Sequence, residues 1–441
     1  MNKNWSQTIT YRALSVERPD SVREIQDLME NQTITSVKAF GTRHCFNTIA
    51  DTREDGIHIC LDAFKMIRCD NDRDEVHFGA GVTYSELIEE VDRTGKAVEN
   101  LPSLPHINVV GSMITCTHGS GANHKILAAN VTGFEIVLPD GVIRSIVKED
   151  PSSGPGHSAG EKLSRSSFYS HLISFGAIGV ITSMSMKVVP PFKVYKSIHE
   201  KLQWDTIFND ANFDAIMRAG DFMSFFCDWQ KREMSTVWIG RKFPDDGDPP
   251  FVGDTFYGAP HITIQRVHPV PGNDPSACVT VGAGSWKNKV YHFLPDQAPS
   301  AGGDEIQTEY FVSYRDFRDA MNALYAIREK FNHLVQITEL RMIAADDIPM
   351  SPGKGTDVVA IHWTWFRRPE EIAAVLPQIE DVLEPFNAKP HFGKLFGLDA
   401  ATMAKLYGDD LETLKGLIER YDPSGKFRNQ FVQHYLFGSS P

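Results

Sequence analysis

The sequence lacks the features that mark membrane, secreted and metal-stabilised proteins. Its 441 residues contain no apolar stretch as long as a membrane helix requires, and residues 1–6 have none of the apolar character of a secretory signal. The six cysteines form no Cys-x-x-Cys pair, and their spacing matches neither a zinc site nor a compact disulfide framework. We therefore expect a cytoplasmic protein with free thiols and no metal site.

An excess of positive charge is also missing. The formal net charge is −13, with 44 basic against 57 acidic residues. This balance argues against a nucleic acid or an anionic membrane as the main partner. A hydrophobic fraction of 41% is ordinary for a globular protein of two or three domains. We expect a monomer that acts on small molecules.

Common nucleotide and nucleophile motifs are absent or unconvincing. There is no Walker loop, and Gly79-Ala-Gly81 and Gly119-Ser-Gly121 both lack the third glycine of a dinucleotide fingerprint. The segment Gly156-His-Ser-Ala-Gly160 matches Gly-x-Ser-x-Gly by letter. Prolines and glycines precede it where a nucleophile elbow needs a buried strand, so chance explains the match better.

Periodicity and turn signals predict a chain that alternates helix and strand, with a change of character at Pro190-Pro191. Capping boxes at Ser21–Glu24 and Thr83–Glu86 begin two helices, and the second ends near Gly95. An Asp140-Gly141 turn predicts a hairpin. Strands are predicted at 37–40, 57–61, 75–79, 134–138, 142–146, 180–189, 307–313, 334–342 and 358–366, and further helices at 167–174, 314–332, 369–383 and 400–421.

Three stretches give no regular pattern. Residues 101–123 are poor in helix signals, and residues 148–162 are rich in Pro, Ser and Gly, as surface loops are. Residues 241–303 are crowded with Pro, Gly and Asp. A loop of that length is usually either functional or an irregular segment that covers the rest of the protein.

The segment Ala39-Phe-Gly-Thr-Arg-His-Cys-Phe-Asn47 is the most informative loop. It follows a predicted strand and turns at Gly41 into small and polar residues around His44. A glycine turn of this kind can aim successive backbone N–H groups inward and form an anion nest. We expect this loop to hold the phosphates of a cofactor.

Polar and bulky apolar residues alternate on three strands of the second half. Since residues i and i+2 share a strand face, Glu339 and Arg341 lie together, as do His362 and Thr364, and Gln307 and Glu309. One interpretation is a wet, concave sheet face that binds a ligand. The other is a solvated sheet exterior, which is the commoner source of such alternation.

With these segments identified, the chain resembles the FAD enzymes of the vanillyl-alcohol-oxidase type. Within that class it is similar to the alditol oxidases and their aldonolactone-oxidase relatives. The resemblance rests on Gly41–Asn47, Pro105-His-Ile107, Thr117-His-Gly-Ser-Gly121 and Phe175-Gly-Ala-Ile-Gly-Val180. It extends from Asn4-Trp-Ser to Asp422–Asn429, nearly the whole chain.

The resemblance implies an α+β, two-domain FAD-linked oxidase (PCMH-type) fold. Residues 1–192 would form the FAD-binding domain, and residues 193–396 a cap whose antiparallel sheet covers the flavin. Residues 397–441 would return to the FAD domain. FAD would lie between the two domains, a usual place for a pocket.

The resemblance also implies that FAD is bonded covalently to His44 through the flavin 8-methyl carbon. The family usually has Ser where Cys45 stands, so Cys45 is a departure from the pattern. Whether Cys45 affects the flavin is left open. His106 and His118 are interpreted as structural or flavin-neighbouring residues. The cofactor-binding residues are predicted to be Gly41, Thr42, Arg43, His44, Cys45, Phe46, Asn47, Gly111, Ser112, Thr115, Thr117, His118, Gly119, Gly179 and Val180.

By the same resemblance, the expected reaction is oxidation of the terminal alcohol of a polyol such as xylitol or sorbitol, with O2 reduced to H2O2. Arg341, Lys394 and Glu339 are the expected catalytic residues, and Lys394 is also a possible proton acceptor. The expected substrate-binding residues are Gln307, His362, Thr364 and Ser112. One alternative is an aldonolactone oxidase or dehydrogenase, and another is a flavin-free binding protein that keeps the fold.

Overall fold

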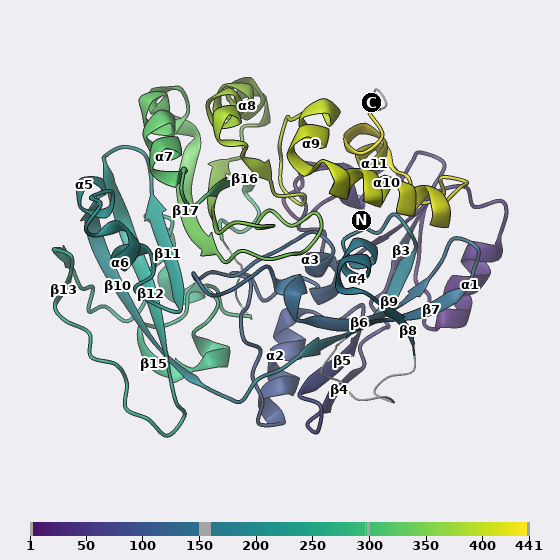
Figure 1. The fold of residues 1–441 in the computed structure, drawn as a ribbon, viewed down its shortest axis with the longest axis horizontal. Helices are drawn as coiled ribbons and strands as arrows, with labels where there is room; N and C mark the ends of the chain where they lie inside the picture. The colour runs from purple at the N-terminus through teal and green to yellow at the C-terminus, as the bar shows by residue number, and fades with distance from the viewer. Residues whose placement is uncertain (1–2, 150–159, 296, 298–299, 439–441) are drawn as a thin grey trace.

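The computed structural model describes residues 3–149, 160–295, 297 and 300–438 (Figure 1). The chain folds into two halves, and each half contains one large β-sheet. Mixed helix and sheet give the predicted α+β class. The predicted boundary at Pro190-Pro191 falls between the last strand of one large sheet and the first strand of the other.

The first half contains two sheets. A parallel sheet has the order β1-β3-β2, and a six-stranded sheet has the order β4-β5-β9-β6-β7-β8. The strands are β1 (Ser15–Glu17), β2 (Val37–Phe40), β3 (Ile57–Cys60), β4 (Ile67–Asp70), β5 (Glu75–Gly79), β6 (Val131–Val137), β7 (Ile143–Lys148), β8 (Glu161–Leu163) and β9 (Val180–Lys187). The helices are α1 (Val22–Glu30), α2 (Tyr84–Arg93), α3 (Val109–Met113) and α4 (Arg165–Leu172).

Local sequence signals explain the starts of the first two long helices. Ser21 caps α1 by accepting a hydrogen bond from Glu24 N, whereas the Glu24 carboxylate accepts from Asp20 N instead of Ser21 N. The capping box of α2 is complete, because the side chains of Thr83 and Glu86 each accept from the other's backbone N–H.

The second half is built on an eight-stranded antiparallel sheet with the order β15-β10-β12-β11-β17-β18-β16-β19. Its strands are β10 (Lys193–Gln203), β11 (Phe222–Cys227), β12 (Glu233–Phe243), β15 (Gly282–Ser285), β16 (Glu305–Ser313), β17 (Val335–Ile343), β18 (Val358–Phe366) and β19 (Lys389–Pro390). A small hairpin pairs β13 (Thr255–Phe256) with β14 (Ala259–Pro260). The helices are α5 (Trp204–Ile207), α6 (Phe213–Met217), α7 (Phe317–Ala326) and α8 (Pro369–Leu383), which lie along the outer side of the sheet (Figure 1).

The C-terminal helices return to the first half. They are α9 (Ala400–Tyr407), α10 (Asp409–Tyr421) and α11 (Gln430–Tyr435), drawn in yellow in Figure 1. Asn429 secures this return, because its amide donates to the backbone oxygens of Thr48, Ile49 and Asp51 at 2.7–3.1 Å.

Several expected boundaries are wrong. The helix expected at 400–421 is two helices separated at Gly408, and the helix expected at 314–332 is only α7 followed by two short turns. Residues 101–123 contain α3, and residues 241–303 contain the end of β12 and three short strands. Of the loop expected at 148–162, residues 161–162 belong to β8; most of the Gly156–Gly160 motif lies outside the described residues.

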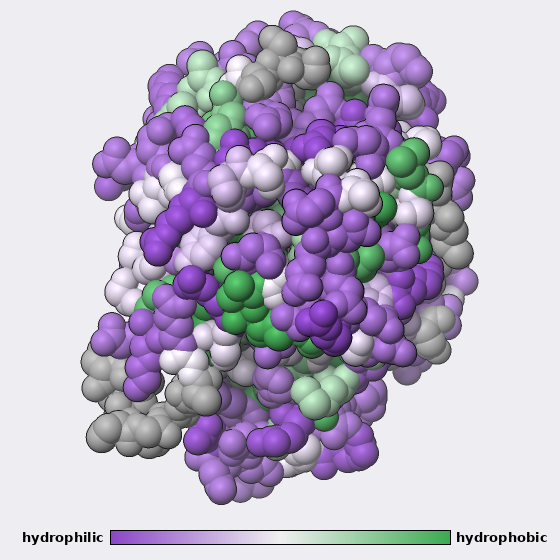
Figure 2. Space-filling view, turned by 90° about the vertical axis from the view of Figure 1, so that its right-hand side faces the viewer, coloured by the Kyte–Doolittle hydropathy of each residue, from purple (hydrophilic) through white to green (hydrophobic). Residues whose placement is uncertain are grey.

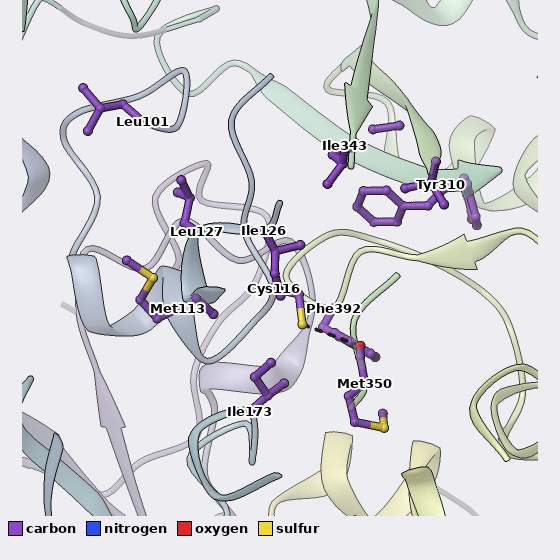
Figure 3. Packing of buried hydrophobic residues seen from close by; sticks show 14 of the residues in the cluster. Leu101, Met113, Cys116, Ile126, Leu127, Ile173, Tyr310, Ile343, Met350 and Phe392 are labelled. Atoms are coloured by element: carbon purple, nitrogen blue, oxygen red, sulfur yellow. Dashed lines mark hydrogen bonds between the residues drawn. The ribbon is translucent and has the colours of Figure 1, made fainter. Parts of the chain in front are cut away.

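A continuous apolar core joins the two halves. Figure 3 shows Cys116 of the first half beside Met350 of the second, and Cys116 Sγ donates to the Met350 carbonyl oxygen at 3.6 Å. Ile343, Tyr310 and Phe392 belong to the same cluster. The shared core fixes the cap over the first half, and that placement forms the site.

One face of the molecule is mainly hydrophilic. On the face drawn in Figure 2, hydrophilic side chains dominate and the apolar ones lie in small separate groups. Within the described residues, every helix is too short or too polar to span a bilayer.

Candidate active site

The loop after β2 forms one wall of a large cavity. A side chain at Gly41 would collide with Asn108, so only glycine fits there. Arg43 has a φ of 62°, the left-handed conformation that turns the loop back. The N-terminal segment covers the loop: Trp5 N donates to Arg43 O at 2.9 Å, and the Asn4 amide donates to Cys45 O at 3.0 Å.

His44 lies on this wall, half-buried, with its ring stacked on Trp5 at a centroid distance of 4.1 Å. Burial, reinforced by the positive charge of Lys394, lowers the pKa of His44 to about 3. The imidazole is therefore neutral at physiological pH, the form that carries a free lone pair.

Cys45 also lines the cavity, and burial raises the pKa of its thiol to about 11. The thiol therefore stays protonated and unreactive at neutral pH. The next two residues face away from the cavity. Phe46 is buried in the core, and the Asn47 amide donates to the backbone oxygens of Phe392 and Lys394 at 2.7 Å each. These contacts tie the loop to the segment that carries Lys394.

The helix α3 and the loop after it form the floor. Gly111 has open space where a side chain would be, and Thr115, Thr117 and His118 line the cavity with it. Ser112 lines it too, but its hydroxyl bonds Tyr84 OH at 2.8 Å and donates to Val109 O at 2.7 Å. Its role as a substrate contact stays a prediction.

Of the other predicted cofactor residues, Gly41, Thr42, Arg43 and Gly179 line the cavity. Gly179 has a φ of 150°, and a side chain there would meet Val137 O. Gly119 packs against the Asn100 side chain, and Val180 is fully buried in the core. These last two residues support the cavity from behind.

The opposite wall is the polar face of the cap sheet. Register places Glu339 beside His362, His362 beside Glu309, and Gln307 beside Thr364. These side chains are all buried, as is Arg341. The alternative of a solvated sheet exterior is therefore wrong.

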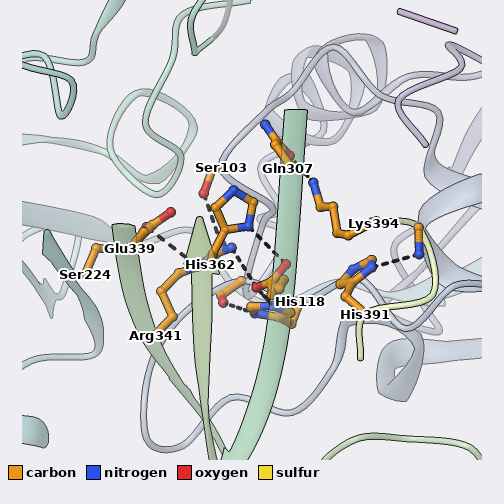
Figure 4. A network of polar contacts seen from close by, with 12 residues as sticks. Ser103, His118, Ser224, Gln307, Glu339, Arg341, His362, His391 and Lys394 are labelled. Carbon is orange, nitrogen blue, oxygen red and sulfur yellow. Dashed lines mark hydrogen bonds and ion pairs between the residues drawn. The ribbon is translucent and has the colours of Figure 1, made fainter. Parts of the chain in front are cut away.

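Glu309 contacts three members of the polar set, His118, His362 and Arg341, whose side chains converge in Figure 4. Its carboxylate lies 2.8 Å from His118 Nε2, 3.2 Å from His362 Nδ1 and 3.6 Å from Arg341 Nη2. Burial alone would raise the pKa of Glu309, but His118 and His362 outweigh it and hold the pKa well below its usual range. Glu309 is thus a buried anion.

Glu339 and Arg341 form a second group. Arg341 Nη1 donates to Ser103 Oγ at 3.0 Å, and Arg341 Nε lies 3.6 Å from Glu339 Oε1. His292 Nε2 lies 3.4 Å from the same carboxylate oxygen. Burial would raise the pKa of Glu339, but Arg341 opposes this effect, and the pKa lies below its usual value. Glu339 is therefore ionised.

Lys394 reaches the cavity from the loop after β19. Its ammonium donates to Gln307 Oε1, and the Gln307 amide donates to Glu305. Burial lowers the pKa of Lys394, although the neighbouring Glu309 acts in the opposite direction. Thr364 Oγ1 makes no hydrogen bond to another described residue, so it is available to a ligand.

One cavity joins the nest, the α3 floor and the cap sheet face, and all seven predicted catalytic and substrate-binding residues line it. Several further lining residues were not predicted as site residues from the sequence. Glu309 was predictable from the sequence, because it shares a strand face with Gln307, whereas no local pattern singles out the rest. They include Lys38, Ser103, Asn108, His292, Glu309 and His391.

The wall residues fit FAD. The nest offers backbone donors, and Lys38 Nζ, bonded to Phe175 O at 2.6 Å, adds a basic group. Apolar residues beside the nest suit a flat ring, among them Ile49, Leu61, Ile107 and Ile181. Neutral His44 on the same wall can approach the ring edge.

Two family models match separate parts of the chain. Residues 13–146 match a model described as an FAD binding domain. Residues 304–435 match a model described as D-arabinono-1,4-lactone oxidase. The first region contains the nest and the floor, and the second contains β16, β17, β18 and Lys394.

Known proteins resemble the chain over its full length. An alditol oxidase of Streptomyces sp. (strain IKD472 / FERM P-14339) is 34% identical over 438 residues, 99% of each chain. An L-gulono-1,4-lactone dehydrogenase of Mycobacterium tuberculosis is 21% identical over 98% of each chain. An L-gulonolactone oxidase of Scyliorhinus torazame is 20% identical, covering 99% of this chain and 98% of the relative.

A solved structure supports the fold. The crystal structure of cholesterol oxidase from B. sterolicum superposes with a TM-score of 0.74, covering 98% of this chain and 96% of that one, at 14% sequence identity. This likeness confirms the two-domain FAD-linked oxidase fold.

Proposed function

The chain belongs to the alditol oxidase family of FAD-dependent oxidoreductases, and we propose that it oxidises the terminal alcohol of a polyol to an aldehyde. The observation that carries this proposal is the buried polar face opposite the nest. A ligand rich in hydroxyls needs such a lining, because each buried polar group left unpaired costs about 1–3 kcal/mol.

When bound, FAD supplies the oxidant, which takes a hydride from the carbinol carbon. The protein binds and orients the alcohol. Arg341 and Lys394 place positive charge near the oxygen that becomes alkoxide-like, which stabilises the transition state. Glu339 and Thr364 offer acceptors and donors to the remaining hydroxyls, and His362 lines the cavity beside them. Gln307 acts mainly through Lys394, which it holds.

We further propose that His44 bonds the FAD covalently. Its ring is neutral, stacked on Trp5 and exposed to the cavity. Denatured, washed protein should then stay yellow and fluorescent, and His44→Ala protein should release its flavin on denaturation. Free FAD in the wild-type supernatant would contradict the bond.

We propose O2 as the electron acceptor, reduced to H2O2, and a monomer as the active form. The open space beside Gly111 supports O2 as the acceptor, because it gives a small molecule room at the cavity floor. Assaying peroxide formation and dye reduction in parallel separates an oxidase from a dehydrogenase.

A panel of polyols and five-membered sugar lactones tests the substrate class. We expect peroxide formation with xylitol or sorbitol and a lower kcat/KM with gulono- or galactono-1,4-lactone. The lactone oxidases are the second candidate, since residues 304–435 match their family model. Higher kcat/KM with a lactone would establish that candidate instead.

A further inference from the structure

The buried carboxylate of Glu309 has no role in the reaction as described so far. It lies on β16 at the centre of the cap face, 2% exposed, and contacts His118, His362 and Arg341. Burying an anion is costly unless it is paired. Its position between cavity-lining side chains suggests that the charge serves the site.

Glu309 determines which nitrogen of His362 carries a proton. An ionised carboxylate only accepts hydrogen bonds, so His362 Nδ1, 3.2 Å from Glu309 Oε2, must be the donor. In the neutral ring, Nε2 then carries the lone pair. Nε2 makes no hydrogen bond to another described residue, and the ring lines the cavity. The lone pair is therefore available to a bound hydroxyl.

Besides His44, which is proposed to bond the flavin, three other described histidines line the cavity, and each differs from His362. His118 lies between Glu309 and Gly119 O, two acceptors, so both of its nitrogens donate. His391 Nδ1 accepts from Gly393 N, so its Nε2 is a donor. His292 places Nε2 beside Glu339, and its Nδ1 is buried and makes no hydrogen bond to another described residue.

We propose that Glu309 is a positioning residue that holds His362 as the general base of alcohol oxidation. This inference rests on the proposed function. The substrate O–H bond breaks, its proton forms an N–H bond at His362 Nε2, and the carbonyl double bond forms. The C–H bond breaks at the same carbon, and its electron pair leaves as a hydride to FAD. Ionised Glu309 then stabilises the imidazolium.

Lys394 is the competing proton acceptor. Its amine already donates to Gln307, which Glu305 holds in turn, and this arrangement suits a cation that binds the substrate oxygen. Glu309 raises the pKa of both groups, so the two candidates are separated by their own variants: the acid limb should disappear in the variant that lacks the base.

The charged and titratable groups around His362 come from several elements. They are Glu309 on β16, Glu339 and Arg341 on β17, Lys394 and His391 on the loop after β19, and His118 below. Burial lowers the pKa of His362, and Glu309 opposes that effect. Removing the Glu309 charge should therefore lower the pKa of His362 further.

The test is the Glu309→Gln variant of the FAD-loaded enzyme. We expect kcat/KM for the polyol to fall about 10²–10⁴-fold, the contribution usual for a general base. The acid limb of the kcat/KM profile should shift to lower pH, while flavin absorbance stays at the wild-type level. His362→Gln should be as slow and should lose that limb.

Glu380→Gln is the matched control. Glu380 is a buried carboxylate that accepts hydrogen bonds from Tyr310 OH at 2.5 Å and from Gly397 N at 2.7 Å. Tyr310 lies on the face of β16 opposite to Glu309, so Glu380 is separated from the cavity by the sheet. We expect its pH profile to match the wild type. A wild-type rate and profile in Glu309→Gln would overturn the proposal, as would an acid limb that disappears in Lys394→Met but not in His362→Gln.

A second measurement needs no substrate. Nitrogen-15 NMR of histidine-labelled wild-type enzyme, with His362→Gln used for assignment, should show His362 protonated at Nδ1 and unprotonated at Nε2. The opposite tautomer would overturn the proposal. If the wild type oxidised no polyol, the proposed function would fail, and this spectrum would still test the Glu309–His362 pair.

Discussion

At the scale of single residues, several side chains of the site are each held in place by a specific partner. Ser112 is held by Tyr84, Lys394 by Gln307, and Arg341 by Ser103. His44 has Trp5 as its ring partner. Substitution of a holding residue should therefore change a specific property of the site and leave the fold intact.

Trp5 is expected to control flavin attachment. Trp5→Ala removes the ring that stacks on His44, so the imidazole becomes mobile and a smaller fraction of the FAD should be covalently bound. Trp5→Phe keeps an aromatic ring and serves as the control. Flavin fluorescence of denatured protein, divided by total flavin absorbance, measures the covalent fraction. An equal fraction in all three proteins would contradict the role of stacking.

Arg341→Ala should lower kcat about 10²–10³-fold, because it removes positive charge from the developing alkoxide. FAD content, read from the absorbance spectrum, should not change. Arg165→Ala is the control, since Arg165 pairs with Asp347 at the surface. If Arg341→Ala and Lys394→Ala both turned over polyol normally, the assigned pocket would be wrong.

At the scale of elements, the C-terminal helices show how a local conformation overrides a pattern. The amphipathic pattern of 400–421 continues through residue 408, which is why a single helix was expected. Gly408 has φ 49° and ψ −128°, a conformation that glycine adopts readily and other residues do not. It ends α9 and begins α10 in a new direction.

Gly408 and Gly416 offer a matched test. Added methyl groups meet no atom within 4 Å at either position, so only backbone effects differ. Gly408→Ala should lower the free energy of unfolding by about 1–3 kcal/mol through strain. Gly416→Ala, inside α10, should raise it by about 0.5–1 kcal/mol. Denaturant unfolding measures both, and changes of the same sign would contradict this account of the break.

At the scale of the whole molecule, buried histidines make stability depend on pH. Burial lowers the pKa of His124, which stacks on Phe222 outside the cavity, to about 3, below the usual 6.5. Between these values the unfolded chain binds a proton that the folded chain does not. The stabilising effect is complete above pH 6.5 and is lost progressively as the pH falls towards 3.

His124→Gln should therefore flatten the fall of unfolding free energy between about pH 6 and pH 4, by at most about 1.4 kcal/mol per pH unit. Urea unfolding of the FAD-loaded protein at a series of pH values measures the slope. His333→Gln is the control, because His333 is 54% exposed and solvated in both states. A slope for His124→Gln equal to the wild type would contradict burial of a neutral ring.

The sequence by itself determined the elements whose signals are local. A capping box begins α2, alternation defines β16, β17 and β18, and glycine with polar neighbours marks the nest at 41–47. The family resemblance added FAD and the polar set. These features depend on a few neighbouring residues, so they can be recognised without the fold.

Only the tertiary structure decided which face of the cap sheet is buried and which groups meet there. His118 lies 191 residues before Glu309, and Ser103 lies 238 residues before Arg341. The contacts within these two pairs follow from strand order and from the shared core. Protonation is likewise a tertiary property, because the proton on His362 is positioned by Glu309 from the adjacent strand. No local pattern encodes such a contact, since its geometry exists only when the two halves pack together.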